Sequence, residues 1–545
     1  MSAAKVLIFA PVDEARDTHA KLQEAGCELR LGKASWDTPH GNNEGELAQM
    51  ATGCDALMGT SIRNAPISRK VMESSAGLRV IAKYTIGVDD VDVESATELG
   101  ILVCHGPTES NWGGVAEGTI TAMLTMLKRT RERDRHLKEG GVWRDQKLQG
   151  TYLGARADGY AGITLGLIGL GRIGSRIATL LRPWKMRIIA ADPYVPDAKF
   201  DEHGVTRVDL PTLLRESDVV KLHVVLTRET RHMIDAAQLA LMKPTAILIN
   251  TSRGPCVREA ALTEALIRGQ IGGAALDVFA PEPLAADSPL RNAPRTVLTP
   301  HIAGSTSEAQ VNVAVDVVRQ VLDIIDGKPA RYAVNAPRPP ADEAGGSAWV
   351  RLAERLGSLA AQLLDERPGG IELHYAGQLL EIDPEPLRAA VVKGLLETFS
   401  EQRVNLVNAL AIARARGLDI SEDRETESAR FRALLTVKVG STAVGGTLVQ
   451  GEPRIVFIDG FWVDVPVEGH LLLTKHQDKP GLVGRVGTLL GQHDVNISSM
   501  QVGRLHPRGE ALMILTLDDP VPDEVRAKIG AFDDVDRVRT AKLGV

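Results

Sequence analysis

Cysteine is scarce in this sequence, with four residues in a chain of 545. Cys27, Cys54, Cys104 and Cys256 lie tens of residues apart, form no CxxC pair and have no histidine at metal-ligand spacing. This pattern excludes a disulfide framework and the common zinc sites. We therefore expect reduced, mostly buried thiols and no bound metal.

Aromatic residues and excess positive charge are also lacking. Phe, Trp and Tyr together make up 4% of the chain, and the formal net charge is -7 at pH 7. A nucleic-acid-binding protein needs basic patches and usually aromatic side chains on which bases stack. We expect no nucleic acid partner.

Long hydrophobic runs are absent as well. The longest early run, residues 6–10, is far shorter than a signal-peptide core or the ~20 residues of a membrane helix. No later run reaches that length. The sequence therefore predicts a cytoplasmic protein with no membrane partner.

The chain does contain enough apolar residues for several cores. Hydrophobic residues make up 44% and charged residues 24%, and the length suggests three or four domains. From the strand pattern KVLIFA at Lys5 onward, short apolar strands alternate with helical stretches, which predicts a parallel sheet covered by helices. Apolar residues at helical spacing then predict one long helix over residues 115–138, crossing to a second lobe.

A second alternating series begins at Ile163. It contains six strand candidates, enough for a complete dinucleotide-binding sheet. Residues 336–346, rich in proline, glycine and charge, predict a linker. Beyond it lies a region of amphipathic helices and strands, and the last segment has the order strand, helix, strand, strand, helix, strand of a ferredoxin-like module. The expected fold class is α/β, with two Rossmann-like parallel-sheet domains followed by an α+β domain and a ferredoxin-like domain.

A glycine motif follows the first strand of the second series. Gly169, Gly171 and Gly174 suit, in turn, a tight turn, the approach of a pyrophosphate to the backbone, and close helix packing. Asp192 ends the next strand, 18 residues after Gly174, where its carboxylate can bind ribose hydroxyls. Because that carboxylate would repel a 2′-phosphate, the motif predicts NAD rather than NADP.

Three polar residues follow strands of the same predicted sheet: Arg253, Glu282 and His301. The carboxyl ends of parallel strands line one crevice, so these side chains can converge there. His301 can accept a hydroxyl proton, Glu282 can orient the imidazole, and Arg253 can bind a carboxylate and polarise a developing carbonyl. Singly they also suit a helix cap, a surface acid and a core histidine. Together they predict oxidation of a 2-hydroxy acid.

The motifs VIAKYTIGVDDVDVESAT, GLIGLGRIGSRIA, LINTSRGP, ALDVFAPEP and LTPHIAGST resemble those of the D-2-hydroxyacid dehydrogenase family. Downstream, ERLGSLAAQLL, RVNLVNA, RIVFIDGFWVD and DKPGLVGRVGTLL resemble the long-form D-3-phosphoglycerate dehydrogenases. The resemblance implies a divided substrate-binding domain, an NAD-binding domain, a linker, an intervening domain and an ACT domain. Their expected limits are, in that order, 1–107 with 302–335, 108–301, 336–346, 347–467 and 468–545.

The resemblance also implies the roles of individual residues. Arg253, Glu282 and His301 would be the catalytic triad. The NAD-binding set would be Gly169, Gly171, Arg172, Ile173, Gly174, Asp192, Val224, Thr251, Ser252, Arg253, Asp277, His301 and Gly304. The substrate-binding set would be Lys83, Ile86, Gly87, Asn111 and Arg253.

The substrate region departs from the family pattern. The turn before GVD has Lys83, Tyr84, Thr85 and Ile86 in place of an arginine and a glycine-containing turn. The segment with Asn111 is one residue longer and carries Trp112. A phosphate dianion needs at least two positive or donor groups. The candidates are Arg63, Lys83 and Arg144, and they do not clearly reproduce the family arrangement.

Three function hypotheses follow. The first is NAD-dependent oxidation of D-3-phosphoglycerate to 3-phosphohydroxypyruvate, which opens serine biosynthesis. The second keeps the chemistry but changes the acid to a glyoxylate, hydroxypyruvate or related type. The third is an NAD-sensing binding protein, similar to the C-terminal-binding corepressors.

The resemblance of the last domain to ACT domains implies that it regulates the protein and takes part in its assembly. Relative to serine-regulated members of the family, His476, Asp478 and Asn496 fall at effector positions, so L-serine or another amino acid is the expected effector. A purely structural dimerisation role is the alternative. Because ACT domains usually pair by their strand edges, we expect a homo-oligomer, a dimer or a tetramer.

Overall fold

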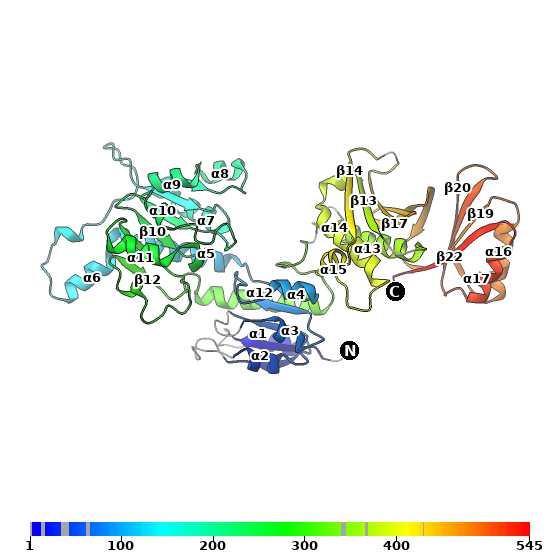
Figure 1. Ribbon diagram of the computed structural model, residues 1–545, viewed down its shortest axis with the longest axis horizontal. Helices are drawn as coiled ribbons and strands as arrows, with labels where there is room; N and C mark the ends of the chain where they lie inside the picture. The colour runs from blue at the N-terminus through cyan, green and yellow to red at the C-terminus, as the bar shows by residue number, and fades with distance from the viewer. Residues whose placement is uncertain are drawn as a thin grey trace.

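The computed structural model contains four β-sheets, each belonging to a separate part of an elongated molecule (Figure 1). It describes residues 3–11, 17–33, 43–60, 66–338, 340, 345–365, 369–428 and 430–544. Arg63 and part of the predicted linker lie outside these ranges. Within them, no helix combines the length and apolar character that a bilayer crossing requires. All four cysteines are buried and unpaired, as expected.

The first sheet has five parallel strands in the order β2-β1-β3-β4-β5. The inner strands β1, β3 and β4 are short apolar segments buried on both faces, as parallel strands covered by helices must be, whereas the edge strand β2 is largely exposed. The chain returns here much later, because Val313 and Val317 of α12 share a core with Val6 and Ile8 of β1. The strands and helices are β1 (Lys5–Ala10), α1 (Asp17–Glu24), β2 (Glu28–Leu31), α2 (Glu44–Ala51), β3 (Ala56–Gly59), α3 (Arg69–Glu73), β4 (Val80–Lys83), α4 (Val93–Glu98), β5 (Leu102–Cys104) and α12 (Ser307–Ile325).

The predicted helix over residues 115–138 is in fact two helices. They are α5 (Glu109–Lys128) and α6 (Thr130–Lys138), separated by Arg129, which has a left-handed φ of 54°. Helix α5 is buried along one side down to Leu127, whereas α6 has no buried residue. Once the apolar face ends, no packing keeps the second segment in line with the first. The prediction of a single helix was therefore wrong.

The second sheet has seven parallel strands in the order β12-β11-β10-β9-β6-β7-β8. The six predicted strands are present, and β8 adds a two-residue edge that is too short and polar to give a sequence signal. The order reverses between β6 and β9, which opens a crevice at their carboxyl ends. The strands and helices are β6 (Thr164–Ile168), α7 (Arg172–Leu181), β7 (Arg187–Ala191), α8 (Asp197–His203), β8 (Thr206–Arg207), α9 (Leu210–Glu216), β9 (Val219–Leu222), α10 (Ala236–Leu239), β10 (Ile247–Asn250), α11 (Glu259–Ile267), β11 (Gly273–Leu276) and β12 (Thr296–Leu298).

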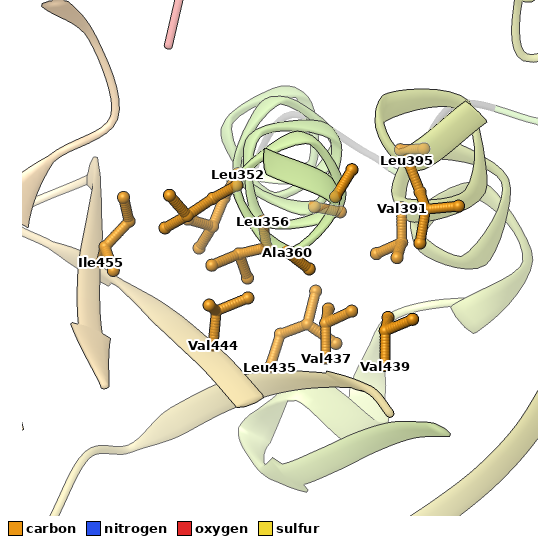
Figure 2. Packing of buried hydrophobic residues seen from close by; sticks show 14 of the residues in the cluster. Leu352, Leu356, Ala360, Val391, Leu395, Leu435, Val437, Val439, Val444 and Ile455 are labelled. Carbon is orange, nitrogen blue, oxygen red and sulfur yellow. The ribbon is translucent and has the colours of Figure 1, made fainter. Parts of the chain in front are cut away.

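The third sheet is mixed, in the order β14-β13-β15-β16-β17-β18, and two long helices cover it. Figure 2 shows Leu352 and Leu356 of α13 above Leu435 and Val444 of the sheet. A Cβ on Gly357 of α13 would lie 2.0 Å from a backbone oxygen of α14, so glycine permits the close helix approach. The strands and helices are α13 (Gly346–Leu363), β13 (Gly370–Gly377), α14 (Pro384–Glu397), α15 (Ala409–Ala415), β14 (Asp419–Glu425), β15 (Ala433–Val439), β16 (Thr442–Val449), β17 (Glu452–Ile458) and β18 (Phe461–Pro466).

The last sheet is antiparallel, in the order β20-β21-β19-β22, and its element order confirms the ferredoxin-like prediction. Its strands alternate between two cores. Leu472 faces α16 and α17, whereas Leu471 and Leu473 enter the core of the third sheet. The last two domains therefore share one core. The elements are β19 (Gly469–Gln477), α16 (Leu482–Gln492), β20 (Ile497–Arg504), β21 (Glu510–Leu517), α17 (Asp523–Gly530) and β22 (Val535–Leu543).

Candidate active site

The glycine motif forms a cradle between β6 and the start of α7. Gly169 has φ 96°, and a Cβ there would lie 2.7 Å from the carbonyl oxygen of His223. A Cβ on Gly174 would lie 2.3 Å from the carbonyl oxygen of Gly169, whereas one on Gly171 would meet nothing within 4 Å. Packing thus requires glycine at positions 169 and 174. Gly171 instead leaves open space beside the helix N-terminus, where Arg172 and Ile173 begin α7, and this space fits a bound pyrophosphate.

Asp192 follows β7 and ties it to the glycine motif. Its Oδ2 accepts a hydrogen bond from Leu170 N at 2.8 Å, and its Oδ1 accepts one from Tyr194 N at 3.0 Å. A carboxylate has about four acceptor sites. Asp192 can therefore hold the loop and still accept bonds from a ribose.

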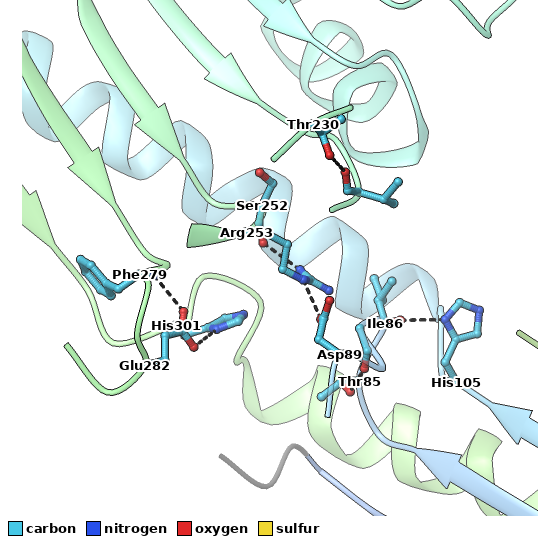
Figure 3. Close-up of polar contacts among 12 residues, drawn as sticks. Thr85, Ile86, Asp89, His105, Thr230, Ser252, Arg253, Phe279, Glu282 and His301 are labelled. Atoms are coloured by element: carbon cyan, nitrogen blue, oxygen red, sulfur yellow. Dashed lines mark hydrogen bonds and ion pairs between the residues drawn. The ribbon is translucent and has the colours of Figure 1, made fainter. Parts of the chain in front are cut away.

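Glu282 and His301 form a close pair in the crevice. His301 Nδ1 lies 2.7 Å from Glu282 Oε2, and the backbone N–H of Phe279 donates to Glu282 Oε1 at 3.0 Å (Figure 3). Because the carboxylate is the acceptor, Nδ1 carries hydrogen and leaves Nε2 as the basic nitrogen. Nearby, burial and the charge of Glu282 raise the pKa of Glu259.

Asp277 holds the loop that presents His301. It is 3% exposed, and it accepts hydrogen bonds from Thr299 Oγ1 at 2.6 Å and from the backbone N–H groups of Ile302 and Ala303 at 3.0 and 2.9 Å. His301 itself has a left-handed φ of 58°. A non-glycine residue adopts this conformation only when its surroundings hold it there, and the bonds to Asp277 do so on both sides of His301.

Arg253 bridges the two lobes of the crevice. Its Nε donates to Asp89 Oδ2 of the first lobe at 2.7 Å, and its NH1 donates to the Ser252 carbonyl at 2.7 Å. A Cβ on Gly87 would lie 2.1 Å from NH2 of Arg253, so this close approach requires glycine. The ring of His301 points toward the side of the crevice where Arg253 meets Asp89 (Figure 3).

Lys83 does not face the crevice. It is completely buried, and its Nζ donates to Asp90 Oδ2 at 2.5 Å and to the Thr60 carbonyl at 2.8 Å. Burial lowers the pKa of Lys83, and the neighbouring Asp90 opposes that shift. The family resemblance suggested a substrate ligand here, but β4 ends at this residue and directs the side chain into the first lobe.

Residues 85–89, which we call the substrate turn, lie at the crevice. The carbonyl of Ile86 accepts a hydrogen bond from His105 Nδ1 at 2.8 Å, and Thr85 Oγ1 donates to the carbonyl of Gly87 at 2.6 Å. Burial lowers the pKa of His105, the bond to Ile86 opposes this, and the charge of Arg172 adds to it. The imidazole of His105 therefore fixes the turn through its bond to the Ile86 carbonyl.

The other residues expected at the crevice lie close to it. Thr251 Oγ1 is 2.8 Å from Thr119 Oγ1 of α5. Thr251 and Asp277 also line a cavity of about 240 Å³ between α5 and the ends of β11 and β12. Three more residues have these neighbours: Val224 lies beside Gly169, Ser252 donates its hydroxyl to the amide oxygen of Asn250, and Gly304 lies against α5 beside Asn111.

The expected effector residues are separately bonded within the last domain. Asp478 accepts hydrogen bonds from Arg504 NH1 and Arg508 N, both at 3.1 Å. Asn496 Nδ2 donates to Asp518 Oδ2 at 2.6 Å. His476 is 2% exposed, with Nδ1 bonded to the Thr474 carbonyl. Each side chain has its own hydrogen-bond partner, and among the described residues no hydrogen bond joins one of the three to another.

Two residues at the crevice, Asp89 and His105, are not predicted from the sequence. Asp89 lies within the IGVDDVD motif, but its partner Arg253 is 164 residues away, so spacing gave no signal of the ion pair. His105 lies just beyond β5, and only the packing of α12 and the first sheet brings it to Ile86. Position at a strand end was the one available indication.

Comparison with known families matches three parts of the chain. Residues 120–303 match the D-isomer specific 2-hydroxyacid dehydrogenase, NAD binding domain. Residues 347–459 match the D-3-phosphoglycerate dehydrogenase intervening domain, and residues 470–534 match the ACT domain.

Two relatives match along almost their whole length. The D-3-phosphoglycerate dehydrogenase of Synechocystis is 38% identical over 548 residues, which cover 99% of this chain and 95% of that protein. The D-3-phosphoglycerate dehydrogenase of Methanocaldococcus jannaschii is 36% identical, covering 99% of this chain and 100% of that protein. Among solved structures, D-lactate dehydrogenase from Aquifex aeolicus, complexed with NAD and lactic acid, has a TM-score of 0.52 at 26% identity. It covers 61% of this chain and 99% of its own.

Proposed function

Because this chain belongs to the D-3-phosphoglycerate dehydrogenase family, we propose that it oxidises D-3-phosphoglycerate to 3-phosphohydroxypyruvate. The observation that carries the proposal is the 2.7 Å contact between Glu282 and His301, placed at strand ends beside Arg253 in an NAD-binding domain. Bound NAD would supply the acceptor for the hydride that leaves C2 of the acid.

The side chains of this protein have separate tasks in that reaction. His301 Nε2 takes the hydroxyl proton, while Glu282 keeps Nδ1 protonated and stabilises the imidazolium that forms. Arg253 binds the carboxylate of the acid and polarises the developing carbonyl. Asp89 accepts from Arg253 at 2.7 Å in this structure, so an incoming carboxylate exchanges with a carboxylate that already neutralises the guanidinium.

The coenzyme would be held by the motif on β6 and α7. The amides of Arg172 and Ile173 lie at the N-terminus of α7 and suit a pyrophosphate, and Asp192 suits the adenosine ribose. Selection of NAD over NADP follows from the negative charge of Asp192, which a 2′-phosphate would face.

The alternative substrate is a 2-hydroxy acid without a phosphate, of the glyoxylate or hydroxypyruvate type. One observation favours it: the amine of Lys83 is buried against Asp90 and is not available to a phosphate. Arg144, another candidate for binding a phosphate, is exposed in the segment after α6.

A substrate panel separates the two candidates. Purified protein should be assayed with NAD and D-3-phosphoglycerate, D-glycerate, glycolate or D-lactate, and with NADP as the matched coenzyme control. We expect turnover with D-3-phosphoglycerate and NAD. Turnover with a non-phosphorylated acid alone would establish the alternative, and tight NADH binding without any turnover would favour an NAD-sensing role.

We also propose a homo-oligomer in the cytoplasm that responds to an amino acid such as L-serine. Exposed apolar side chains support the first part: Leu137 of the otherwise polar helix α6 and Trp143 beyond it are 58% and 80% exposed. Clusters of exposed apolar side chains mark sites of contact with another chain. The ACT domain supports the second part, since amino-acid effectors are the usual ligands of that domain.

A further inference from the structure

Two asparagines of the intervening domain form a closed hydrogen-bond network just before α15. Asn408 Oδ1 accepts from Asn405 N at 2.8 Å, and Asn405 Oδ1 accepts from Val407 N at 3.0 Å. Asn408 Nδ2 donates to the carbonyl of Arg403 at 2.9 Å. Asn408 is only 2% exposed. A buried amide network of this kind is rigid, because each broken bond leaves a polar group unsatisfied.

The network contacts the first lobe at Gly100. Asn405 Nδ2 donates to the carbonyl of Gly100 at 2.7 Å. A Cβ on Gly100 would lie 2.7 Å from Asn408 Nδ2 and 3.0 Å from Asn405 Nδ2, and the residue has φ 68°. Helices α4 and α15 are neighbours at this junction, as Figure 1 also shows. A side chain at position 100 would therefore have to displace these two amides, and the positive φ would strain it as well.

Gly100 lies at the end of α4, whose other end reaches the substrate turn. Helix α4 has six residues, and Asp92 caps its start by accepting from Ser95 N at 3.0 Å and from Ser95 Oγ at 2.6 Å. At ~1.5 Å per residue the helix spans roughly 9 Å. A single short helix thus separates the contact with the intervening domain from Asp89, the partner of Arg253.

Both ends of this helix are fixed. At the turn, the buried pair of Lys83 with Asp90 anchors the residue next to Asp89. At the far end, Asn335 holds the chain after Gly100, since its Nδ2 donates to the carbonyl of Ile101 at 2.9 Å and its Oδ1 accepts from Val103 N at 2.8 Å. Because hydrogen bonds hold the chain at both ends of α4, we expect a displacement of Gly100 to move the whole helix and with it the backbone at Asp89.

We propose that Asn405 and Asn408 are positioning residues for the substrate turn. Through Gly100 and α4, the intervening domain sets where residues 86–89 meet Arg253, and so how tightly the acid binds. The proposal rests on the proposed function of the crevice. It gives the intervening domain an indirect part in substrate binding that requires no effector.

The test uses the full-length protein with Asn408→Ala and Asn405→Ala. We expect KM for the acid to rise about 5- to 20-fold while kcat falls less than about threefold, because binding geometry is disturbed more than proton transfer. The Kd for NADH should stay within twofold, since the NAD-binding domain is untouched. Arg416→Ala, which changes an exposed bond to Ser400 at the other end of α15, is the matched control and should leave all three values unchanged.

Gly100→Ala tests the same contact from the first lobe. If both sides act through one contact, its effect on KM and that of Asn408→Ala should be strongly non-additive in the double variant. Additive effects, or a folded Asn408→Ala protein with an unaltered KM, would overturn the proposal. A chain without activity on any acid before mutation would count against the proposed function instead, so the two failures are distinguishable.

Discussion

In the crevice, Glu282, His301 and Arg253 come from the ends of different strands, and His301 Nε2 has no partner within the described part of the chain. In the ACT domain, Asp478 and Asn496 are each bonded to a neighbour on an adjacent strand or loop. The first set meets across a gap between lobes. The second set is satisfied locally.

This difference bears on what each site needs in order to act. A base with a free nitrogen facing a crevice is ready for a substrate. Side chains already bonded within their own domain bind an effector only by exchanging those bonds or by adding a second chain. We therefore expect changes in the crevice to alter chemistry and changes in the ACT domain to alter regulation.

The largest effect is expected for His301→Ala. Removing the general base should lower kcat by roughly 10²- to 10⁴-fold. NADH binding, measured by fluorescence titration, should persist. Unchanged turnover would show that His301 is not the general base. The polar groups of the crevice would then only stabilise the fold, as the bonded side chains of the ACT domain do.

Asp277→Asn should have the next largest effect. The amide cannot accept from both Thr299 Oγ1 and the two backbone N–H groups, so the loop of His301 loses a fixed position. We expect kcat to fall roughly 10- to 100-fold, as for small misplacements of a catalytic group. Thr299→Val, which removes one of the three bonds, is the milder control. A loss of NADH affinity with normal kcat would show a coenzyme role instead.

Two lysines, Lys221 and Lys83, are fully buried in the catalytic half of the chain and should affect its stability in opposite ways. Lys221 is fully buried without a partner for its Nζ in the described residues, and burial lowers its pKa to about 7. Because the unfolded chain binds this proton up to about pH 10, stability should fall as pH drops from about 10 to about 7 and then level off.

Lys221→Met should remove that pH dependence and stabilise the protein at pH 7, because it replaces a buried amine that has no partner among the described residues by an apolar side chain of similar size. Calorimetry between pH 6 and pH 10 measures both effects. Lys83→Met is the contrasting control, since it removes the ion pair with Asp90 and should destabilise. A stability that is flat with pH in the original chain would mean that Lys221 finds a partner in solution.

The smallest effect on catalysis is expected for Asp478→Ala. Its ion pair with Arg504 is solvent-exposed, and such pairs contribute little to stability. Turnover without serine should change less than about twofold, while inhibition by L-serine should weaken. Equal titration curves for the two proteins would show that this carboxylate binds no amino acid.

Several features could be predicted from the sequence because they depend on local pattern. The alternating strands of both parallel sheets, the six strands after Ile163 and the element order of the last domain are confirmed. The glycine motif also falls where expected, because positive φ at Gly169 and close packing at Gly174 leave no alternative residue.

Other features depend on contacts that no local pattern reveals. The break at Arg129 reflects where buried contacts along α5 end, and the two-residue β8 forms only because β7 is beside it. Lys83 is a polar residue at a strand end, like Arg253, yet packing turns one into the core and the other into the crevice.

The sequence by itself determined the elements, their order and the chemical types available to the crevice, since periodicity and side-chain chemistry are properties of short segments. Only the tertiary structure decided which of those groups meet. The pairing of Arg253 with Asp89 and of Asn405 with Gly100 joins residues 164 and 305 positions apart. Such contacts arise when separately folded layers pack together, and their partners are set by three-dimensional shape rather than by spacing along the chain.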